Sequence, residues 1–318
     1  MKQLSREHFD QARRFLKEEA RAIDRALFEF RFEGAPADAV AEALSAYQNP
    51  DGGFGHALEP DMWTPDSSAL ATDIGLTMLK EIGASADHPM VQRAVRYLCG
   101  TFDPHSGVWR VIPHGANDHP HAPWWHDEEG SLARTFDQFL IIPRARLVGL
   151  LHHFAPAVFG AAAPAEWLDD VTRRTVADVE TIDRLGTGGG DDLAYALDLA
   201  AEKSVPAPYR ERVLDRVRRE VPRAVSRDPA QWHAYSLHPL KIVHAPDSPV
   251  ADLIWDVIQL DLDYQIDHQS PEGTWDPVWT WSGNYPDAWQ QACHEWRGHL
   301  TLETLTTLRA FGRIREEA

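Results

Sequence analysis

The sequence predicts an all-α fold of repeated helical hairpins, and three observations support this. Apolar residues recur at the spacing of a helix along most of the 318 residues. The helical stretches are separated by turns rich in Pro, Gly and Asp. One kind of turn occurs three times, at residues 48–54, 103–109 and 269–275. A turn that recurs between helices is typical of helical-repeat architectures.

The repeated turn has a physical basis. Each copy places a glycine at its fifth position, where a reversal of the chain needs a backbone that accepts φ > 0. An aromatic residue follows two positions later, and we expect its ring to cap the end of the helix that the chain has just left. The pairs are Gly52 and Phe54, Gly107 and Trp109, and Gly273 and Trp275.

The first third of the chain contains four helical stretches. Apolar residues at helical spacing predict one long helix over residues 5–31. Pro36 opens a short second helix. Ser67 and Ser68 are N-cap candidates for an almost entirely apolar helix that ends at Gly83. The helix after it has polar residues on one face, so inner and outer helices are expected to alternate.

The remaining elements are less regular. A long connection at 103–137 lacks periodicity, but it contains two adjacent Trp, which argue against disorder. Asp191 and Asp192 fall in the first turn of a helix, where capping explains them. Pro239 breaks a short helical stretch. Further helices are predicted at 143–154, 165–182, 191–202, 208–225, 249–269 and 297–314.

The spacing of Gln, three residues, Gly, one residue and an aromatic at 48–54 and 269–275 resembles a known repeat. It is similar to the Gln/Trp repeat of squalene-hopene-type terpenoid cyclases and of protein prenyltransferase β subunits. The resemblance implies an α/α toroid, a closed barrel of about five to six helical hairpins that forms a single domain over residues 1–318. It also implies that the repeat residues brace the fold. An open α-solenoid is the alternative.

The composition limits the classes of partner. The formal charge of −18, from 31 Lys and Arg against 49 Asp and Glu, repels phosphate backbones, so no nucleic-acid partner is expected. The N-terminal stretch is charged and unlike a signal peptide, and no apolar run is long enough for a membrane span. Cys99 and Cys293 give no disulfide framework. We therefore expect a cytoplasmic protein, with its oligomeric state left open.

Aromatic residues concentrate in the loops that precede the apolar helices. Loops that enter inner helices from one rim would converge, so these rings predict an aromatic-lined cavity, although any single Trp could fill the core instead. Ring faces stabilise a carbocation without attacking it, which suits a small hydrophobic substrate. The substrate-binding candidates are Trp63, His121, Trp124, Trp125, Trp232, His233, Trp279, Trp281, Tyr285 and Trp289.

The acid of the resembled class II cyclases is an Asp in a D-x-D-D motif, which this sequence lacks. At the comparable place it has Glu59, Asp61 and Asp66. Asp66 abuts a helix start and is explained as a cap, so we predict Asp61 as the proton donor with Glu59 as its partner. A second acidic pair around Asp261 falls on the 249–269 helix and is expected to be solvated surface.

Metal and cofactor signals are weak. The prenyltransferase branch of the resemblance requires zinc, but no Asp-x-Cys pattern precedes Cys293 and His294. No Gly-rich phosphate cradle follows a strand. We therefore expect neither a metal nor a cofactor. An open alternative is a metal held by the 114–127 loop, which fits no standard zinc signature and contains His114, Asp118, His119, His121, His126 and Asp127.

Two function classes follow. The leading hypothesis is a lyase or isomerase of the terpenoid cyclase type, which cyclises or isomerises a hydrophobic prenyl substrate after protonation by an acid. The alternatives are a protein that binds or processes a saccharide or other polar ligand, and a non-catalytic prenyltransferase-like protein. A terpenoid cavity should have a nearly dry apolar floor, whereas a saccharide site should stay polar along its length.

Overall fold

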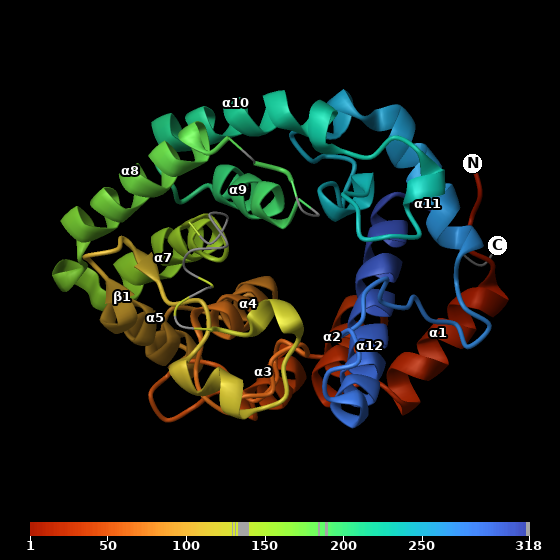
Figure 1. The fold of residues 1–318 in the computed structure, drawn as a ribbon, viewed down its shortest axis with the longest axis horizontal. Helices are drawn as coiled ribbons and strands as arrows, with labels where there is room; N and C mark the ends of the chain where they lie inside the picture. Colours follow the sequence, from red (N-terminus) through yellow and green to blue (C-terminus); the bar gives the residue numbers. More distant parts are fainter. Residues whose placement is uncertain (129, 131, 133–139, 184, 188–189, 316–318) are drawn as a thin grey trace. The chain divides into compact units, whose positions relative to one another are not determined.

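The computed structural model describes residues 1–128, 130, 132, 140–183, 185–187 and 190–315. These residues are mainly α-helical, which confirms the predicted class (Figure 1). The described part of the chain contains one two-stranded antiparallel ribbon, in which β1 (Phe102–Asp103) pairs with β2 (Val108–Trp109). No helix in these ranges is both long and apolar enough to cross a membrane.

The chain divides into two compact units. Unit 1 comprises Met1–Ala43, Thr187–Gly190 and Val221–Ala318, and unit 2 comprises Leu44–Gly186 and Asp191–Glu220. The boundary falls inside α3 (Ala37–Ser45). That residues 1–318 form a single closed domain stays a prediction.

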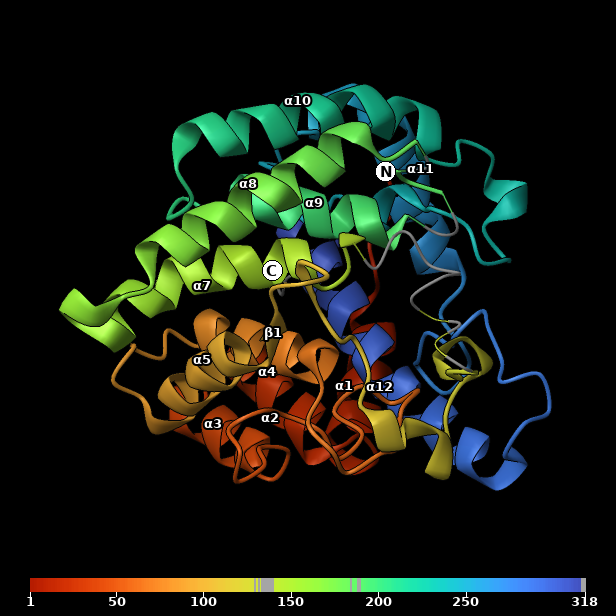
Figure 2. The same cartoon turned by 60° about the vertical axis from the view of Figure 1, so that its left-hand side comes forward.

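Unit 2 is organised around α7, which packs against four other helices, α4, α5, α8 and α9. Figures 1 and 2 show α7 between α8 and α5. The whole length of α4 is largely buried, as its apolar sequence predicted. The helices of this unit are α4 (Ala69–Glu81), α5 (Pro89–Thr101), α7 (Arg144–Phe159), α8 (Ala165–Thr181), α9 (Asp191–Ala201) and most of α10 (Ala207–Ala224).

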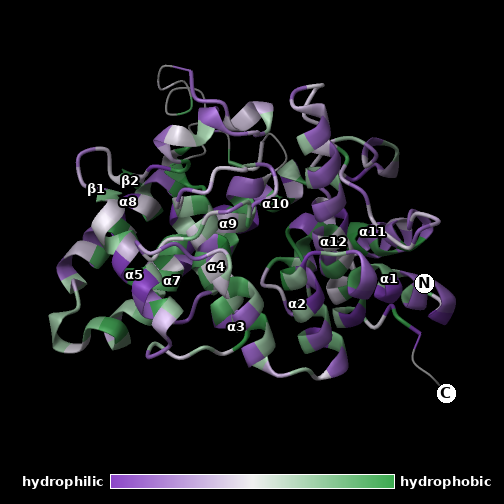
Figure 3. Cartoon of the chain, turned by 90° about the horizontal axis from the view of Figure 1, so that it is seen from below, coloured by the Kyte–Doolittle hydropathy of each residue, from purple (hydrophilic) through white to green (hydrophobic). Residues whose placement is uncertain are grey.

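Unit 1 is organised around its last helix, α12, which packs against α1 and α2. Three short 3-10 turns pack on α11. Figure 3 shows hydrophilic residues recurring along α12. The elements of this unit are α1 (Arg6–Glu18), α2 (Ala22–Glu33), η5 (Pro229–Gln231), η6 (Pro239–Lys241), η7 (Ala251–Leu253), α11 (Trp255–Asp267) and α12 (Pro286–Ala310).

The glutamines of the repeated turn make the same contacts in both units. Gln48 Nε2 donates to Gly52 O and to Met90 O at the start of α5, each over 2.9 Å. Gln269 Nε2 donates to Gly273 O over 2.9 Å and to His8 O at the start of α1 over 3.0 Å. Each glutamine therefore closes its own turn and fastens it to a neighbouring helix.

The aromatic residues of the turns complete the fastening. Phe54 N donates to Thr72 Oγ1 on α4 over 3.0 Å, and Trp275 N donates to Thr301 Oγ1 on α12 over 3.1 Å. Trp275 Nε1 also donates to Gln265 O, in the last turn of α11, over 2.9 Å. In the second copy, Trp109 Nε1 donates over 2.8 Å to a carbonyl near the end of α5. The predicted capping of the preceding helix by the ring is confirmed for both tryptophans.

The glycines of the turns have the predicted backbone. Their φ angles are 97° at Gly52, 77° at Gly107 and 88° at Gly273. A Cβ at Gly52 would lie 2.5 Å from Arg93 O, and one at Gly273 would lie 2.7 Å from Ala12 N. Only glycine permits both the turn and this close approach of the next helix.

Four details of the sequence interpretation are wrong. The single helix at 5–31 is two helices, because the chain turns at 19–21 so that α1 and α2 can each bury one apolar face. The stretch around Pro239 forms 3-10 turns and no α-helix. The last helix starts at Pro286, eleven residues before the predicted 297. Asp261 is fully buried because it accepts hydrogen bonds from a neighbouring loop.

Candidate functional site

The candidate site lies on one face of α12 in unit 1. Glu295, His299 and Glu303 follow one another at intervals of four residues, which places their side chains on one face of the helix. All three side chains are partly exposed. Gly298 lets this part of α12 approach α2 closely, because a Cβ there would lie 3.1 Å from Ala20 Cβ and 3.3 Å from Asp24 Oδ2.

The carboxylates at the two ends of this face differ in their electrostatics. Burial raises the pKa of Glu295 above its ordinary value, and the hydrogen bond that Gln291 donates over 2.8 Å only partly opposes this. Burial acts in the same direction on Glu303, but Arg31 outweighs it and holds the pKa of Glu303 below its ordinary value. Arg31 Nη1 donates to Glu303 Oε1 over 2.7 Å. Glu295 is therefore the better proton donor, and Glu303 stays ionised.

His299 stands between these carboxylates. Burial lowers its pKa below the ordinary 6.5, although the nearby carboxylates of Glu303 and Asp24 oppose the shift. The imidazole is therefore neutral at neutral pH and has one nitrogen able to accept a proton. Adjacent groups whose environments drive their pKa values in opposite directions are typical of acid–base sites.

A row of aromatic rings leads to His299. The Tyr235 ring centroid lies 6.2 Å from that of Trp279, and Trp279 lies 5.1 Å from Trp296, both in edge-to-face geometry. Trp296 in turn lies 5.5 Å from His299. At the other end Tyr235 is 48% exposed, and Lys241 Nζ lies 4.1 Å over its ring. We call Tyr235, Trp279, Trp296 and His299 the aromatic row.

Beneath this face a buried ion pair supports the helix. Asp24 on α2 is fully buried and accepts two hydrogen bonds from Arg21, over 2.7 and 3.1 Å. Charge-assisted bidentate pairs of this kind are geometrically rigid. The pair therefore keeps α2 and its contact with Gly298 in place.

Asp61, the predicted acid, lies in unit 2, in a loop whose backbone pairs with residues 114–127, which we call the His-rich connection. Asp61 O accepts from Ala122 N over 2.8 Å, and Trp63 N donates to Pro120 O over 3.0 Å. Asp61 is 2% exposed and Glu59 is 7% exposed. The structure thus brings the backbones of the 59–63 and 119–125 segments together, and with them the candidates Trp63, His121, Trp124 and Trp125. Proton donation by Asp61 stays a prediction.

The His-rich connection is ordered by its own contacts. His121 Nε2 lies 3.0 Å from His126 Nδ1, and their rings stack with centroids 5.2 Å apart. Burial lowers the pKa of His121. Asp127 accepts a hydrogen bond from Arg110 over 3.0 Å. Within the described ranges, no three His, Cys, Asp or Glu side chains are grouped as metal ligands would be.

The other aromatic candidates lie in unit 1 and fall into separate groups. Trp279 belongs to the aromatic row. Trp281 is fully buried, with Trp289 at 5.7 Å and Tyr285 at 6.5 Å between ring centroids. Trp232 is fully buried against His238 and Tyr264, and His233 is exposed. Trp232 is therefore a core residue and not a surface that a ligand could contact.

Unit 2 has its own polar cluster, formed by α4, α7 and α9. Arg146 Nε lies 3.0 Å from Asp73 Oδ1, its Nη1 lies 3.2 Å from Asp198, and its guanidinium lies 4.0 Å over the Tyr195 ring. Burial raises the pKa of Asp73, and Arg146 partly offsets this. Since the guanidinium of Arg146 on α7 binds groups from α4 and α9, the cluster ties these three helices together.

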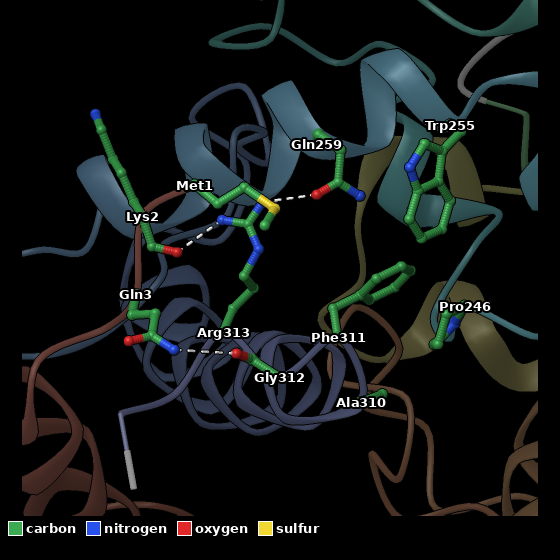
Figure 4. Close-up of a pocket in the computed structure, with 10 residues that line it drawn as sticks. All are labelled: Met1, Lys2, Gln3, Pro246, Trp255, Gln259, Ala310, Phe311, Gly312 and Arg313. Atoms are coloured by element: carbon green, nitrogen blue, oxygen red, sulfur yellow. Dashed lines mark hydrogen bonds between the residues drawn. The ribbon is translucent and has the colours of Figure 1, made fainter.

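A pocket of about 380 Å³ lies beside the N-terminal segment of unit 1 (Figure 4). Its walls include the rings of Trp255 and Phe311, which lie 6.1 Å apart. Its one buried charge, Arg313, donates to Lys2 O, to Asp263 over 2.6 Å and to Gln259 over 2.8 Å. The guanidinium is therefore engaged by the protein itself.

Sequence reasoning missed the α12 face. Residues 286–296 were interpreted as a loop, so Glu295 was not aligned with His299 and Glu303. The spacing E-x-x-x-H-x-x-x-E and the proline at the first helical position, Pro286, were the signals that could have revealed it. Comparisons with protein-family models, with curated proteins and with solved structures found no match.

Proposed function

We propose that the chain is an enzyme that acts on a saccharide-type ligand by general acid–base catalysis on the α12 face. The observation that carries this proposal is the aromatic row ending at His299 between Glu295 and Glu303. Flat aromatic rings stack on the apolar faces of sugar rings, and carboxylates bind their hydroxyls. The charged, partly exposed face of α12 favours this function over a terpenoid site, which needs a dry apolar floor.

The roles follow from the electrostatics. Glu295 is the general acid, because burial raises its pKa and so makes it the better proton donor of the two carboxyls. His299 is the general base, because burial lowers its pKa and keeps it neutral. In hydrolysis, His299 takes a proton from the attacking water and Glu295 gives its proton to the leaving oxygen. Glu303, held ionised by Arg31, stabilises positive charge that develops on the sugar or on His299.

The test uses cellotriose, maltotriose and chitotriose. Calorimetry measures their binding, and product analysis measures their hydrolysis. Glu295→Gln should lower turnover by roughly 100- to 10,000-fold while leaving binding of the sugar almost unchanged. Asp287→Asn, which removes an exposed carboxylate in the first turn of the same helix, is the matched control and should keep full activity. Full turnover in Glu295→Gln would refute the assigned acid.

The pH profile tests the pair of roles. Turnover should fall on the acidic side as His299 gains a proton, at a pH below 6.5, and on the alkaline side as Glu295 loses its proton, at a pH above 4.5. Glu295→Gln should abolish the alkaline limb and keep the acidic one. An alkaline limb that survives this substitution would contradict the role of Glu295.

Acid-initiated cyclisation of a prenyl substrate is the second candidate, and the burial of Asp61 and Glu59 favours it. They lie beside Leu58 and Met62, which are 2% and 3% exposed, so the two carboxyls stand in apolar surroundings. Asp61→Asn keeps the shape and removes the proton, so conversion of a panel of linear polyprenyl alkenes, followed by mass spectrometry, should fall by roughly 100- to 10,000-fold. Undiminished conversion by Asp61→Asn would exclude it as the donor.

The proposal extends to fold and location. The shared fastening of α4 and α12 by a Gln, a Gly, an aromatic residue and a Thr supports helical repeats that close into an α/α toroid. A cytoplasmic location is supported by the presence of only two cysteines among 318 residues. Small-angle X-ray scattering tests closure, because an open solenoid gives a longer maximum dimension than a ring.

A further inference from the structure

A buried polar network in unit 1 holds the chain segment that carries Tyr235, the exposed end of the aromatic row. His238 is 8% exposed and Asp261 is fully buried. His238 Nε2 lies 2.9 Å from Trp232 O, and its Nδ1 lies 3.4 Å from Asp261 Oδ1. The other oxygen of Asp261 accepts from Leu240 N over 3.0 Å. The network therefore joins α11 to the segment that carries Tyr235 and Lys241.

The contacts of His238 hold the ring at both nitrogens. Trp232 O can only accept, so His238 Nε2 donates to it. Asp261 Oδ1, 3.4 Å from Nδ1, also accepts from Gln265 Nε2 over 3.0 Å. The imidazole therefore spans from the carbonyl of the loop to the carboxylate on α11.

Hydrogen bonds within residues 226–241 close this segment into a loop. Ser226 N donates to Leu237 O over 2.9 Å, and Trp232 Nε1 donates to Ser226 O over 3.1 Å. The fully buried indole of Trp232 fills the interior of the loop and packs 5.3 Å from the His238 ring. In the sequence, Tyr235 lies between Trp232 and His238. Its side chain is exposed, and its ring contacts that of Trp279.

We propose that His238 is a positioning residue for ligand binding. Held between Asp261 and the Trp232 carbonyl, it fixes the 226–241 loop so that Tyr235 and Lys241 stand at the exposed end of the aromatic row. This inference rests on the proposed function, since it assumes that the row is where the ligand stacks. The ligand contacts Tyr235, and His238 acts only through the loop.

The first experiment needs no ligand. Hydrogen–deuterium exchange of the full chain should show the amides of residues 226–241 protected in the wild type and exchanging faster in Asp261→Asn. Asparagine keeps an oxygen for Leu240 N, so that anchor on α11 is retained while the contact with His238 is weakened. Equal exchange of this loop in the two proteins would overturn the inference and leave the proposed function untouched.

The second experiment measures the affinity for cellotriose, maltotriose and chitotriose by calorimetry. Asp261→Asn should weaken binding roughly three- to tenfold, because one aromatic stacking contact contributes an affinity of about this size. Turnover of bound sugar should not fall. Tyr235→Ala should weaken it equally, and the double variant should lose no more than either single one. Tyr264→Phe keeps the ring that packs 6.0 Å from His238 and serves as the matched control, with unchanged affinity.

The outcomes separate the two ideas. If no sugar binds the wild type, the proposed function fails, and the exchange experiment still decides whether His238 fixes the loop. If Asp261→Asn exchanges faster but keeps its affinity, positioning by His238 is overturned. If Asp261→Asn does not fold, His238→Gln replaces it, because glutamine can still donate to Trp232 O but loses the contact with Asp261; unchanged affinity there also overturns the inference.

Discussion

The helices α4 and α12 are fastened to the turns before them by the same bonds, but they begin at different distances from the fastening. Three residues precede Thr72 in α4, whereas fifteen precede Thr301 in α12. At 1.5 Å per residue, α12 therefore extends about 18 Å further toward its N-terminus. Glu295 and Trp296 lie on this extension, and His299 lies at its base.

The difference shows how one copy of a repeated helix can carry additional polar residues while the hydrogen bonds that hold the helix stay the same. The bonds from the turn backbone to a threonine hold each helix at one level, so residues beyond that level are free to serve a site. In α4 the positions around Thr72 are almost all buried, and its one buried acid, Asp73, is paired with Arg146. In α12 the corresponding face is polar and partly exposed.

The largest expected loss of stability comes from removing the ring of Trp275, which joins the third turn to α11. Trp275→Ala should lower the free energy of unfolding by about 3 to 5 kcal/mol, because it empties a buried ring site and frees Gln265 O. Trp275→Phe keeps most of the ring, as Phe54 does in the first turn, and should cost only about 1 kcal/mol for the lost hydrogen bond. Urea denaturation measures both. Equal losses in the two variants would show that the indole N–H, and not the ring, provides the fastening.

A smaller loss of stability is expected when a turn glycine is replaced, and the loss should be larger in the third copy than in the second. Gly273→Ala places a Cβ 2.7 Å from Ala12 N at φ 88°, so backbone strain and overpacking together should cost about 2 to 4 kcal/mol. Gly107→Ala meets nothing closer than an Arg174 side-chain nitrogen at 3.6 Å and should cost about 1 to 2 kcal/mol for its φ of 77° alone. Thermal unfolding of both variants measures this, and a Gly107 variant as unstable as the Gly273 variant would contradict it.

The turns were predictable, because their signal is local. A glycine that needs φ > 0 and an aromatic that caps the previous helix are both readable from seven consecutive residues, 103–109 or 269–275. The burial of Asp261 was not predictable, since it depends on Leu240 N and His238, which reach it from a distant loop. Nothing near Asp261 in the sequence indicates those partners.

The start of α12 was missed for a different reason. A surface helix is recognised by an apolar stripe, but from Pro286 to Arg297 only Ala292 is buried. The half-buried positions carry Glu295 and Trp296, residues of the proposed site, and do not form an apolar packing stripe. A helix that presents a polar site therefore loses the periodicity by which sequence reasoning finds helices.

The smallest expected effect is a stabilisation, and it comes from a hydrogen bond that Gln48 makes and Gln269 lacks. Arg93 Nε donates to Gln48 Oε1 over 3.1 Å, whereas Gln269 Oε1 is buried and has no hydrogen-bond partner among the described residues. Gln11 occupies the place of Arg93, since a Cβ at Gly273 would meet the Gln11 backbone as one at Gly52 would meet that of Arg93.

Gln11→Arg should therefore supply the missing donor and raise the free energy of unfolding by about 1 kcal/mol, because a charged donor to a buried oxygen is worth more than the side-chain entropy it costs. Gln11→Lys is the matched control: it adds the same charge to a chain of formal charge −18 but lacks the planar fork. Denaturant unfolding of both variants decides the matter. A gain that is the same for lysine, or that persists when Gln269 is changed to Leu, would mean that Gln11→Arg acts through net charge and not through Gln269 Oε1.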